Sequence, residues 1–82
     1  MREFIINKIS DALLINPEDI NDYDLLDDYR ADSLDFANIV IDLEDEFGIH
    51  FSPDDLERMR FYRVGQLIKF IENKYNSKNN FK

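Results

Sequence analysis

Apolar residues recur at helical spacing in three stretches of the chain, which more polar segments separate. The three sets are Ile5, Ile9, Ala12 and Leu13; then Phe36, Ile39, Val40, Leu43 and Phe47; and last Val64, Leu67, Ile68, Ile71 and Tyr75. Intervals of three and four residues place each set on one face of a helix, so the pattern predicts three amphipathic helices. Asn16-Pro17 should end the first helix and Gly48 the second, because proline and glycine commonly follow helices.

The segments between these helices predict one long loop and one short helix. Residues 18–31 show no sustained period and are rich in Asp and Asn, which indicates a loop. The apolar residues that should hold this loop in place are Ile20, Leu25 and Leu26. Further along, Ser52 followed by Pro53 and two acids is typical of a helix start, which predicts a short third helix.

These elements together predict the fold class and the domain organisation. We expect an all-α protein, a small four-helix bundle with a long loop between helices 1 and 2 and a short third helix. The length of 82 residues allows one domain with a modest core. That domain should cover residues 1–75, and the mostly polar residues 76–82 should form a frayed C-terminal tail.

The start of the second predicted helix carries the chemistry of greatest interest. Asp32 is placed to cap this helix, and Asp35 three residues later completes a capping-box pattern. Ser33 then occupies the first helical position, with its hydroxyl at the helix end. An anion attached to this hydroxyl would lie against unpaired N–H groups and the positive end of the helix dipole. Without further context, however, Asp-Ser-Leu is only a capped helix.

The residues around Ser33 supply that context. Residues 28–35 (DYRADSLD) resemble the prosthetic-group attachment site of acyl carrier proteins. The resemblance extends along most of the chain, roughly from Ile5 to Tyr75, with the spacing preserved. It includes residues 15–20 (INPEDI), 25–28 (LLDD), 43–49 (LEDEFGI) and 64–72 (VGQLIKFIE).

The resemblance implies a cofactor and a set of partners. Ser33 would carry phosphopantetheine through a phosphodiester, received from coenzyme A through a phosphopantetheinyl transferase, with Asp32 as the helix cap beside it. Acyl-transfer and chain-elongation enzymes with basic docking patches would be the further partners. Fatty acid biosynthesis is the first pathway that the resemblance implies, and a carrier for polyketide, aryl or aminoacyl groups is the alternative.

Three departures from the family pattern keep the pathway open. Tyr29-Arg30 replaces the Leu-Gly pair common in relatives, and Asn38 replaces an acid. The connection over residues 58–63 is basic and aromatic and slightly longer than usual. None of these changes affects a helix start with an accessible hydroxyl, but they leave a specialised carrier as well as a general one.

Charge is distributed unevenly along the chain, whose net charge is −8. Residues 18–57 hold 15 acidic residues and one basic residue, Arg30, whereas the flanks hold three acids and nine bases. Such an acidic segment repels nucleic acids and suits partners with Lys and Arg patches. The alternative is a solvated face that only keeps the domain soluble.

A second apolar stripe on the helix after Ser33 predicts a docking surface. Leu34, Ala37 and Ile41 lie at helical spacing on the side roughly opposite Leu43. The predicted partner-binding residues are Leu34, Asp35, Ala37, Asn38, Ile41, Asp42, Glu44 and Asp45. The alternative is that the stripe packs beneath the long loop or the third helix.

Catalytic and metal-binding interpretations find little support. A nucleophilic serine needs a base within hydrogen-bond reach, and the one histidine, His50, is separated from Ser33 by a full helix. The chain has no cysteine, and the acids from Asp22 onward fail the calcium-loop pattern because Asp27 stands where glycine is needed. We therefore expect no metal site and a non-catalytic carrier that is the substrate of its partner enzymes.

Remaining expectations concern location and the alternative class. The apolar run at the N-terminus is too short for a signal peptide, and no stretch is long enough to span a bilayer, so we expect a cytoplasmic protein. We also expect it to be a monomer. From a different class, the alternative is a helical adaptor that has no prosthetic group and binds proteins through Leu34 and Ile41.

Overall fold

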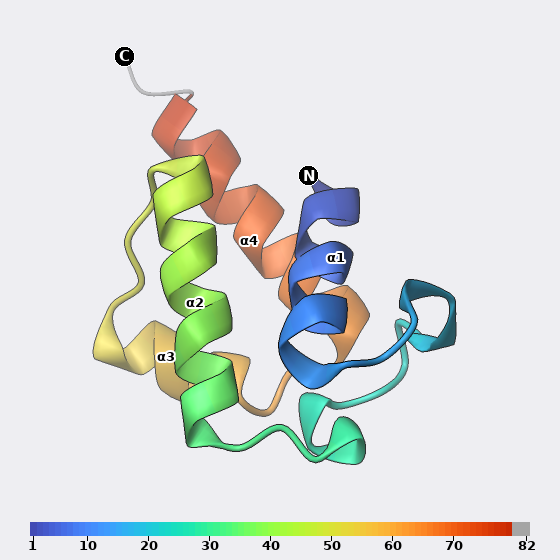
Figure 1. The fold of residues 1–82 in the computed structure, drawn as a ribbon. Coiled ribbons are helices and arrows are strands. Elements are labelled where there is room, and N and C mark those ends of the chain that lie inside the picture. Colours follow the sequence, from blue (N-terminus) through green and yellow to red (C-terminus); the bar gives the residue numbers. More distant parts are fainter. Residues whose placement is uncertain (80–82) are drawn as a thin grey trace.

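The computed structural model describes residues 1–79, and helices dominate these residues (Figure 1). The four α-helices are α1 (Arg2–Leu13), α2 (Ser33–Phe47), α3 (Pro53–Met59) and α4 (Val64–Asn79). Two short 3-10 helices, η1 (Pro17–Asp19) and η2 (Leu26–Tyr29), lie in the long connection between α1 and α2. The predicted all-α bundle with a long first loop and a short third helix is confirmed.

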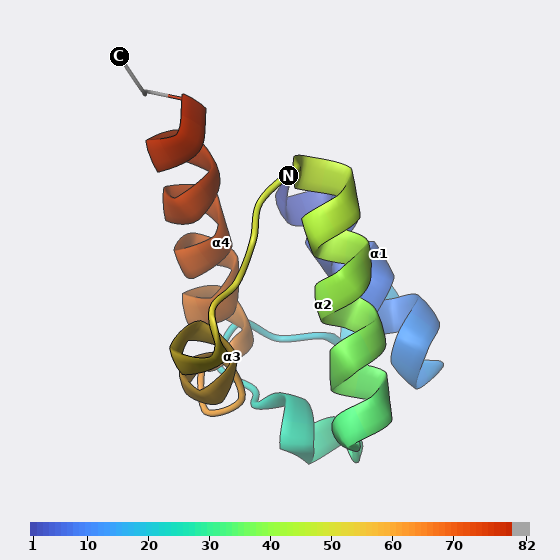
Figure 2. The ribbon, with the colours of Figure 1, turned by 90° about the vertical axis from the view of Figure 1, so that its left-hand side faces the viewer.

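The helices pack so that the start of α2 lies at one end of the bundle. Figures 1 and 2 show α1 and α2 side by side and antiparallel, and α3 near the lower end of the molecule. In Figure 2 the ribbon of α4 stands apart from this pair, and its buried side chains belong to the same core cluster. The first residues of α2, η2 and the connection from α3 to α4 all lie at this lower end. Ser33, as the first residue of α2, is therefore at the end of the bundle where the loops gather.

One apolar core joins all four helices and the loop. Its fourteen buried residues are Ile5, Ile9, Ile20, Leu26, Ile39, Val40, Leu43, Ile49, Phe51, Met59, Val64, Leu67, Ile68 and Ile71. Each predicted helix stripe contributes at least two members to this core, because a single face of each helix turns inward. Phe47 is only partly buried, at the rim, where its ring meets those of Phe4 and Tyr75 edge-on at centroid distances of 5.2 and 5.7 Å.

The long connection is bound to the start of α4. The backbone N–H groups of Val64 and Gly65 donate to the carbonyl oxygens of Asp24 (2.8 Å) and Asp22 (2.9 Å). The Tyr29 hydroxyl donates to the Asp24 carboxylate at 2.6 Å and accepts from the backbone N–H of Asn21 at 3.1 Å. Burial, followed by the hydrogen bond to Asp24, raises the pKa of Tyr29, so its phenol stays protonated as a donor. These bonds give the loop a defined path.

Two helix ends differ from the expected positions. α1 ends at Leu13 rather than at Asn16-Pro17, because Leu14 adopts a left-handed conformation with φ of 57°. Ser10 stabilises this end: its carbonyl accepts from Ile15 N–H, and its hydroxyl donates to the Ile15 carbonyl. At the other end of the chain, α4 continues through Asn79, so residues 76–79 of the predicted tail are helical. Residues 80–82 of that tail lie outside the described residues.

Candidate functional site

The start of α2 has the predicted capping box. The Asp32 carboxylate accepts from the backbone N–H of Asp35 at 2.8 Å, and the Asp35 carboxylate accepts from that of Asp32 at 3.3 Å. Ser33 is the first helical residue and is exposed to solvent. The cap therefore holds the helix start without using the serine hydroxyl, which stays free for a covalent bond.

The backbone at this helix start fits an attached anion. A helix begins with four N–H groups that have no acceptor one turn earlier. The capping box satisfies those of Asp32 and Asp35, and it leaves those of Ser33 and Leu34 for another acceptor. Together with the helix dipole, they favour a negative group on the Ser33 oxygen. The residues present thus fit a phosphodiester.

A small cleft beside this helix start is closed by a basic residue from the end of α3. The residues that line the cleft are Leu26, Asp27, Ala31, Asp32, Phe36 and Arg60. The guanidinium carbon of Arg60 lies 6.0 Å from the centroid of the Phe36 ring, which places the cation over the ring. The sequence shows the basic segment over residues 58–63, but it did not predict that Arg60 lines this cleft.

Arg30, the other cation near Ser33, takes an unusual backbone conformation. It follows η2 with φ of 63°, in the left-handed region, and its N–H donates to the carbonyls of Asp27 and Leu26. A glycine at this position would adopt the same turn without a steric cost. The side chain of Arg30 is exposed.

The second apolar stripe of α2 is exposed, so the alternative that it packs beneath the loop or α3 is wrong. Leu34 is 69% exposed and Ile41 is 53% exposed, and Ala37 between them is also exposed. Ala37 and Ile41 form one side of a groove of about 290 Å³ between α2 and α3. Its lining residues are Phe36, Ala37, Val40, Ile41, Glu44, His50, Phe51 and Leu56.

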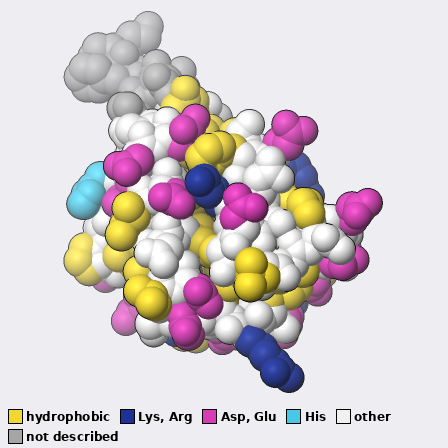
Figure 3. Space-filling model, in the orientation of Figure 1, with side chains coloured by type: hydrophobic (Ala, Val, Ile, Leu, Met, Phe, Trp, Pro, Cys, Tyr) yellow, Lys and Arg dark blue, Asp and Glu magenta, His cyan; other side chains and the backbone are white. Residues whose placement is uncertain are grey.

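The polar residues around this stripe fall into two groups. Asn38 and Asp45 are exposed, and their side chains form no hydrogen bond or ion pair with the side chains described over residues 1–77. Asp35, Asp42 and Glu44 already have partners in the fold: Asp35 belongs to the capping box, and Asp42 lies 3.5 Å from the Lys8 ammonium. Figure 3 shows acidic and hydrophobic side chains alternating over the face that α2 presents.

Glu44 has a structural contact that its sequence position did not reveal. Its carboxylate accepts from the backbone N–H of Phe51 at 2.9 Å, and it lies 3.4 Å from Nδ1 of His50. This contact joins the end of α2 to the segment before α3, because Glu44 belongs to α2 and Phe51 lies between the two helices. Glu44 therefore supports the groove as well as lying at its edge.

Neither a base nor a metal centre lies at Ser33 among the described residues. His50 is 87% exposed and contacts Glu44, which lies about 16 Å along the helix axis from Ser33. Within residues 1–79, no group of three or more His, Cys, Asp or Glu side chains is placed to hold a metal ion. What the arrangement offers chemically is an accessible hydroxyl at a helix end that favours anions.

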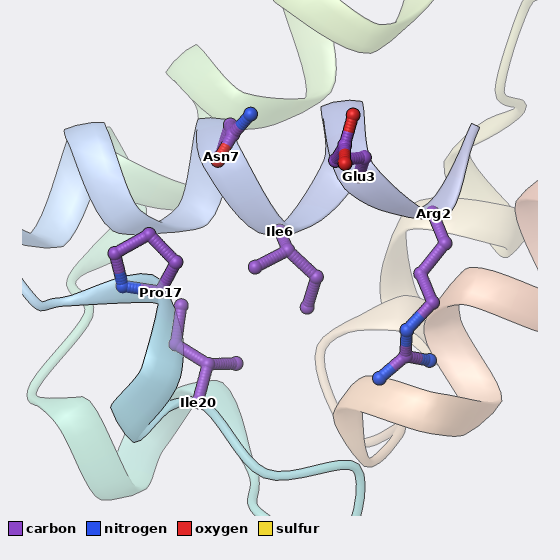
Figure 4. Close-up of a pocket in the computed structure, with 6 residues that line it drawn as sticks. All are labelled: Arg2, Glu3, Ile6, Asn7, Pro17 and Ile20. Atoms are coloured by element: carbon purple, nitrogen blue, oxygen red, sulfur yellow. The ribbon is translucent and has the colours of Figure 1, made fainter.

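A hollow of about 610 Å³ lies elsewhere, between α1 and η1. Six residues line it: Arg2, Glu3, Ile6, Asn7, Pro17 and Ile20. In Figure 4, Ile6, Pro17 and Ile20 point toward the same space, and Arg2 extends from the start of α1 beside them. None of the six belongs to α2, so this hollow is not part of the site at Ser33.

Comparison with known proteins agrees with this geometry. The family model described as a phosphopantetheine attachment site matches residues 3–71. The acyl carrier protein of Chlamydia trachomatis serovar D is 39% identical over 69 residues, which are 83% of this chain and 87% of the relative. That of Lactobacillus johnsonii is 37% identical over 79 residues, 90% of this chain and 96% of the relative. That of Thermotoga maritima is 37% identical over 78 residues, 89% and 94% of the two chains. No solved structure matches the chain significantly.

Fold, site and similarity define the class as a phosphopantetheine-carrying domain. The chain belongs to the acyl carrier protein family. The prosthetic group of this class is phosphopantetheine, which supplies a flexible arm that ends in a thiol. Among residues 1–79, no helix is both long and apolar enough to cross a membrane.

Proposed function

We propose that Ser33 is the residue that carries phosphopantetheine and that the protein holds acyl intermediates as thioesters on this arm. The observation that carries the proposal is the capping box of Asp32 and Asp35, which leaves the Ser33 hydroxyl and two N–H groups free. The chain itself catalyses nothing in this proposal. Its thioester activates the acyl carbonyl for partner enzymes, which perform the chemistry.

The attachment reaction defines what the transferase must supply. The Ser33 oxygen attacks the phosphorus on the pantetheine side of the coenzyme A diphosphate and forms the phosphodiester. The bond to the second phosphate breaks, and adenosine 3′,5′-bisphosphate leaves with the electron pair. The hydroxyl proton passes to a base of the transferase, since His50 contacts Glu44, about 16 Å along the axis of α2 from Ser33. The residues of this chain contribute an accessible nucleophile and a helix end that accommodates the phosphate.

The surface of α2 supports a proposal for the partners. Leu34, Ala37 and Ile41 would enter an apolar depression of the transferase and of acyl-handling enzymes, while Asn38 and Asp45 face their basic patches. The groove between α2 and α3 begins at Phe36, close to Ser33, and would shelter an apolar cargo. We further propose that the protein acts as a monomer in the cytoplasm.

The test of attachment is a mass measurement. Incubated with coenzyme A, magnesium and a broad-specificity phosphopantetheinyl transferase, the wild-type chain should gain the mass of one phosphopantetheinyl group. Ser33→Ala should abolish this gain and keep the helical content, because the cap belongs to Asp32. Ser77→Ala, at an exposed serine of α4, is the matched control and should be modified normally. A gain that persists in Ser33→Ala would place the attachment elsewhere.

Fatty acid biosynthesis is the pathway that we propose, and a specialised carrier is the second candidate. The second candidate rests on Tyr29-Arg30 and on the basic, aromatic residues 58–63 beside the site. The modified protein should accept a malonyl group from malonyl-coenzyme A through the malonyl transferase of fatty acid synthesis. If it accepts only aryl or aminoacyl groups from an adenylating enzyme, the protein is a specialised carrier. If the wild-type chain gains no mass where another carrier does, the helical adaptor is the better interpretation.

A further inference from the structure

Arg60 is an exposed cation that lines the cleft beside Ser33. It ends α3, lines the cleft together with Asp32 and Phe36, and lies over the Phe36 ring at 6.0 Å. None of the ion pairs formed within residues 1–79 involves Arg60. Stacking on a ring leaves the edge of a guanidinium, where its N–H groups point outward, available for an acceptor. Arg60 therefore combines a contact with Phe36 and donors that have no acceptor among the described residues.

The surroundings of Ser33 need a cation once a phosphate is attached. Asp27 and Asp32 line the same cleft as Arg60, and Asp32 is the residue directly before Ser33. A phosphodiester on Ser33 adds a further negative charge next to these carboxylates, and like charges at such short separations repel. The two free N–H groups at the helix start offset part of this repulsion. An arginine at the cleft would offset more of it.

We propose that Arg60 is a positioning residue that binds the phosphodiester of the arm on Ser33. The proposal rests on the proposed attachment at Ser33 and adds the residue that orients the arm. A guanidinium donates two parallel hydrogen bonds to phosphate oxygens, which fixes direction as well as charge. Arg58 in α3 and Arg30 carry the same charge and are exposed like Arg60, but neither lines this cleft or lies over the Phe36 ring.

The position of Phe36 determines which way the arm would leave Ser33 when Arg60 binds its phosphate. The same ring that carries Arg60 also lines the groove between α2 and α3. A phosphate held by Arg60 would therefore lie where the cleft and the groove meet, and the arm would leave Ser33 toward the groove. Without Arg60, the arm would be free to point into solvent from the end of the bundle.

The test compares thermal midpoints before and after modification in four proteins: wild type, Arg60→Gln, Arg58→Gln and Arg60→Lys. The change in midpoint on modification should be about 2–5 °C more favourable in the wild type than in Arg60→Gln, because only the wild type gains the phosphate contact. Arg58→Gln should behave like the wild type. Arg60→Lys should fall between the two, since it keeps the charge and loses the planar donors. The difference should shrink as salt is raised.

A second readout follows the side chain itself. In nitrogen-15 spectra, the Nε–H resonance of Arg60 should shift when the wild type is modified, whereas that of Arg58 should not. Equal midpoint changes in the wild type and Arg60→Gln, or an unmoved Arg60 resonance, would overturn the role of Arg60 while leaving the attachment intact. A wild-type chain that is not modified at Ser33 would instead overturn the proposed function, and the role of Arg60 with it.

Discussion

The ammonium of Lys74 on α4 lies 2.9 Å from the carboxylate of Asp55 on α3. Asp55 also accepts from the backbone N–H of Ser52, the residue that caps α3, so a single carboxylate holds the helix start and joins it to α4. Lys74 lies over the rings of Phe51 and Phe70 at 5.9 and 5.8 Å. The hydrogen bond from Lys74 is the largest of the effects that lower the pKa of Asp55. This pair fixes the short helix that forms one wall of the groove.

Asp55→Asn should destabilise the protein at neutral pH and have little effect in acid. A carboxyl whose pKa is lowered by folding stabilises the folded state above its unfolded pKa, near 4, and this contribution is lost as the pH falls through the folded pKa. The asparagine keeps an acceptor for Ser52 but loses the ion pair, which we expect to cost about 1 kcal/mol. Asp54→Asn, in the same helical turn but exposed, is the control for the helix dipole. Urea unfolding at pH 7 and at pH 3 measures both variants, and a difference between wild type and Asp55→Asn that does not shrink between pH 7 and pH 3 would contradict the ion pair.

Ile41→Ala and Leu43→Ala should separate the docking surface from the core. Leu43 is fully buried, so its truncation should cost about 2–5 kcal/mol through lost burial and a cavity. Ile41 is 53% exposed, and its truncation should change the free energy of unfolding by less than about 1 kcal/mol. The rate of phosphopantetheine transfer should nevertheless fall for Ile41→Ala. Stability and transfer rate are measured on the same samples, and a large stability loss for Ile41→Ala would assign it to the core.

Asp45→Lys should slow the transferase reaction through weaker electrostatic attraction. Asp45 is exposed beside the stripe, so its reversal should mainly reduce the association rate, and the reduction should shrink at high salt. Glu18→Lys, a charge reversal at another exposed residue, in η1, is the control and should have a much smaller effect. The measurement is the rate of phosphopantetheine transfer to both variants at low and at high ionic strength. Equal slowing by both variants would mean that only the net charge matters.

Gly65→Ala should destabilise the protein although alanine is the better helix former. A methyl group at Gly65 would lie 3.1 Å from Cβ and 3.3 Å from the carbonyl oxygen of Asp22, closer than these atoms normally approach. The Gly65 N–H also donates to that carbonyl, so the loop cannot move away without losing the bond. We expect a net loss of about 1 kcal/mol by thermal unfolding. Asn73→Ala, at an exposed position of the same helix, should be neutral or stabilising.

Local sequence signals predicted the parts of the structure that neighbouring residues determine. The capping box of Asp32 and Asp35 and the left-handed Gly48 that ends α2 are such features, because each depends on residues within one or two turns. The end of α1 escaped prediction, since the Ser10 contacts with Ile15 compete with a further helical turn.

Contacts between distant parts of the chain explain the other differences. Glu44 was assigned to the partner surface from its position on α2, and its hydrogen bond to Phe51 depends on how the chain returns after the helix. The placement of Arg60 over Phe36 depends on the packing of α3 against α2. No periodicity or motif in the sequence predicts such a contact, although residues 58–63 are unusually basic.

The hydrogen bonds from Val64 and Gly65 to the loop also bear on the order of folding. They join residues roughly forty positions apart, and closing a ring of that length costs chain entropy before any contact is gained. The helices, by contrast, form from local contacts, so the loop should dock late and be released early when the molecule opens. Ser33 lies within this ring. During synthesis, the start of α2 would therefore reach its final surroundings only after residue 65 has left the ribosome.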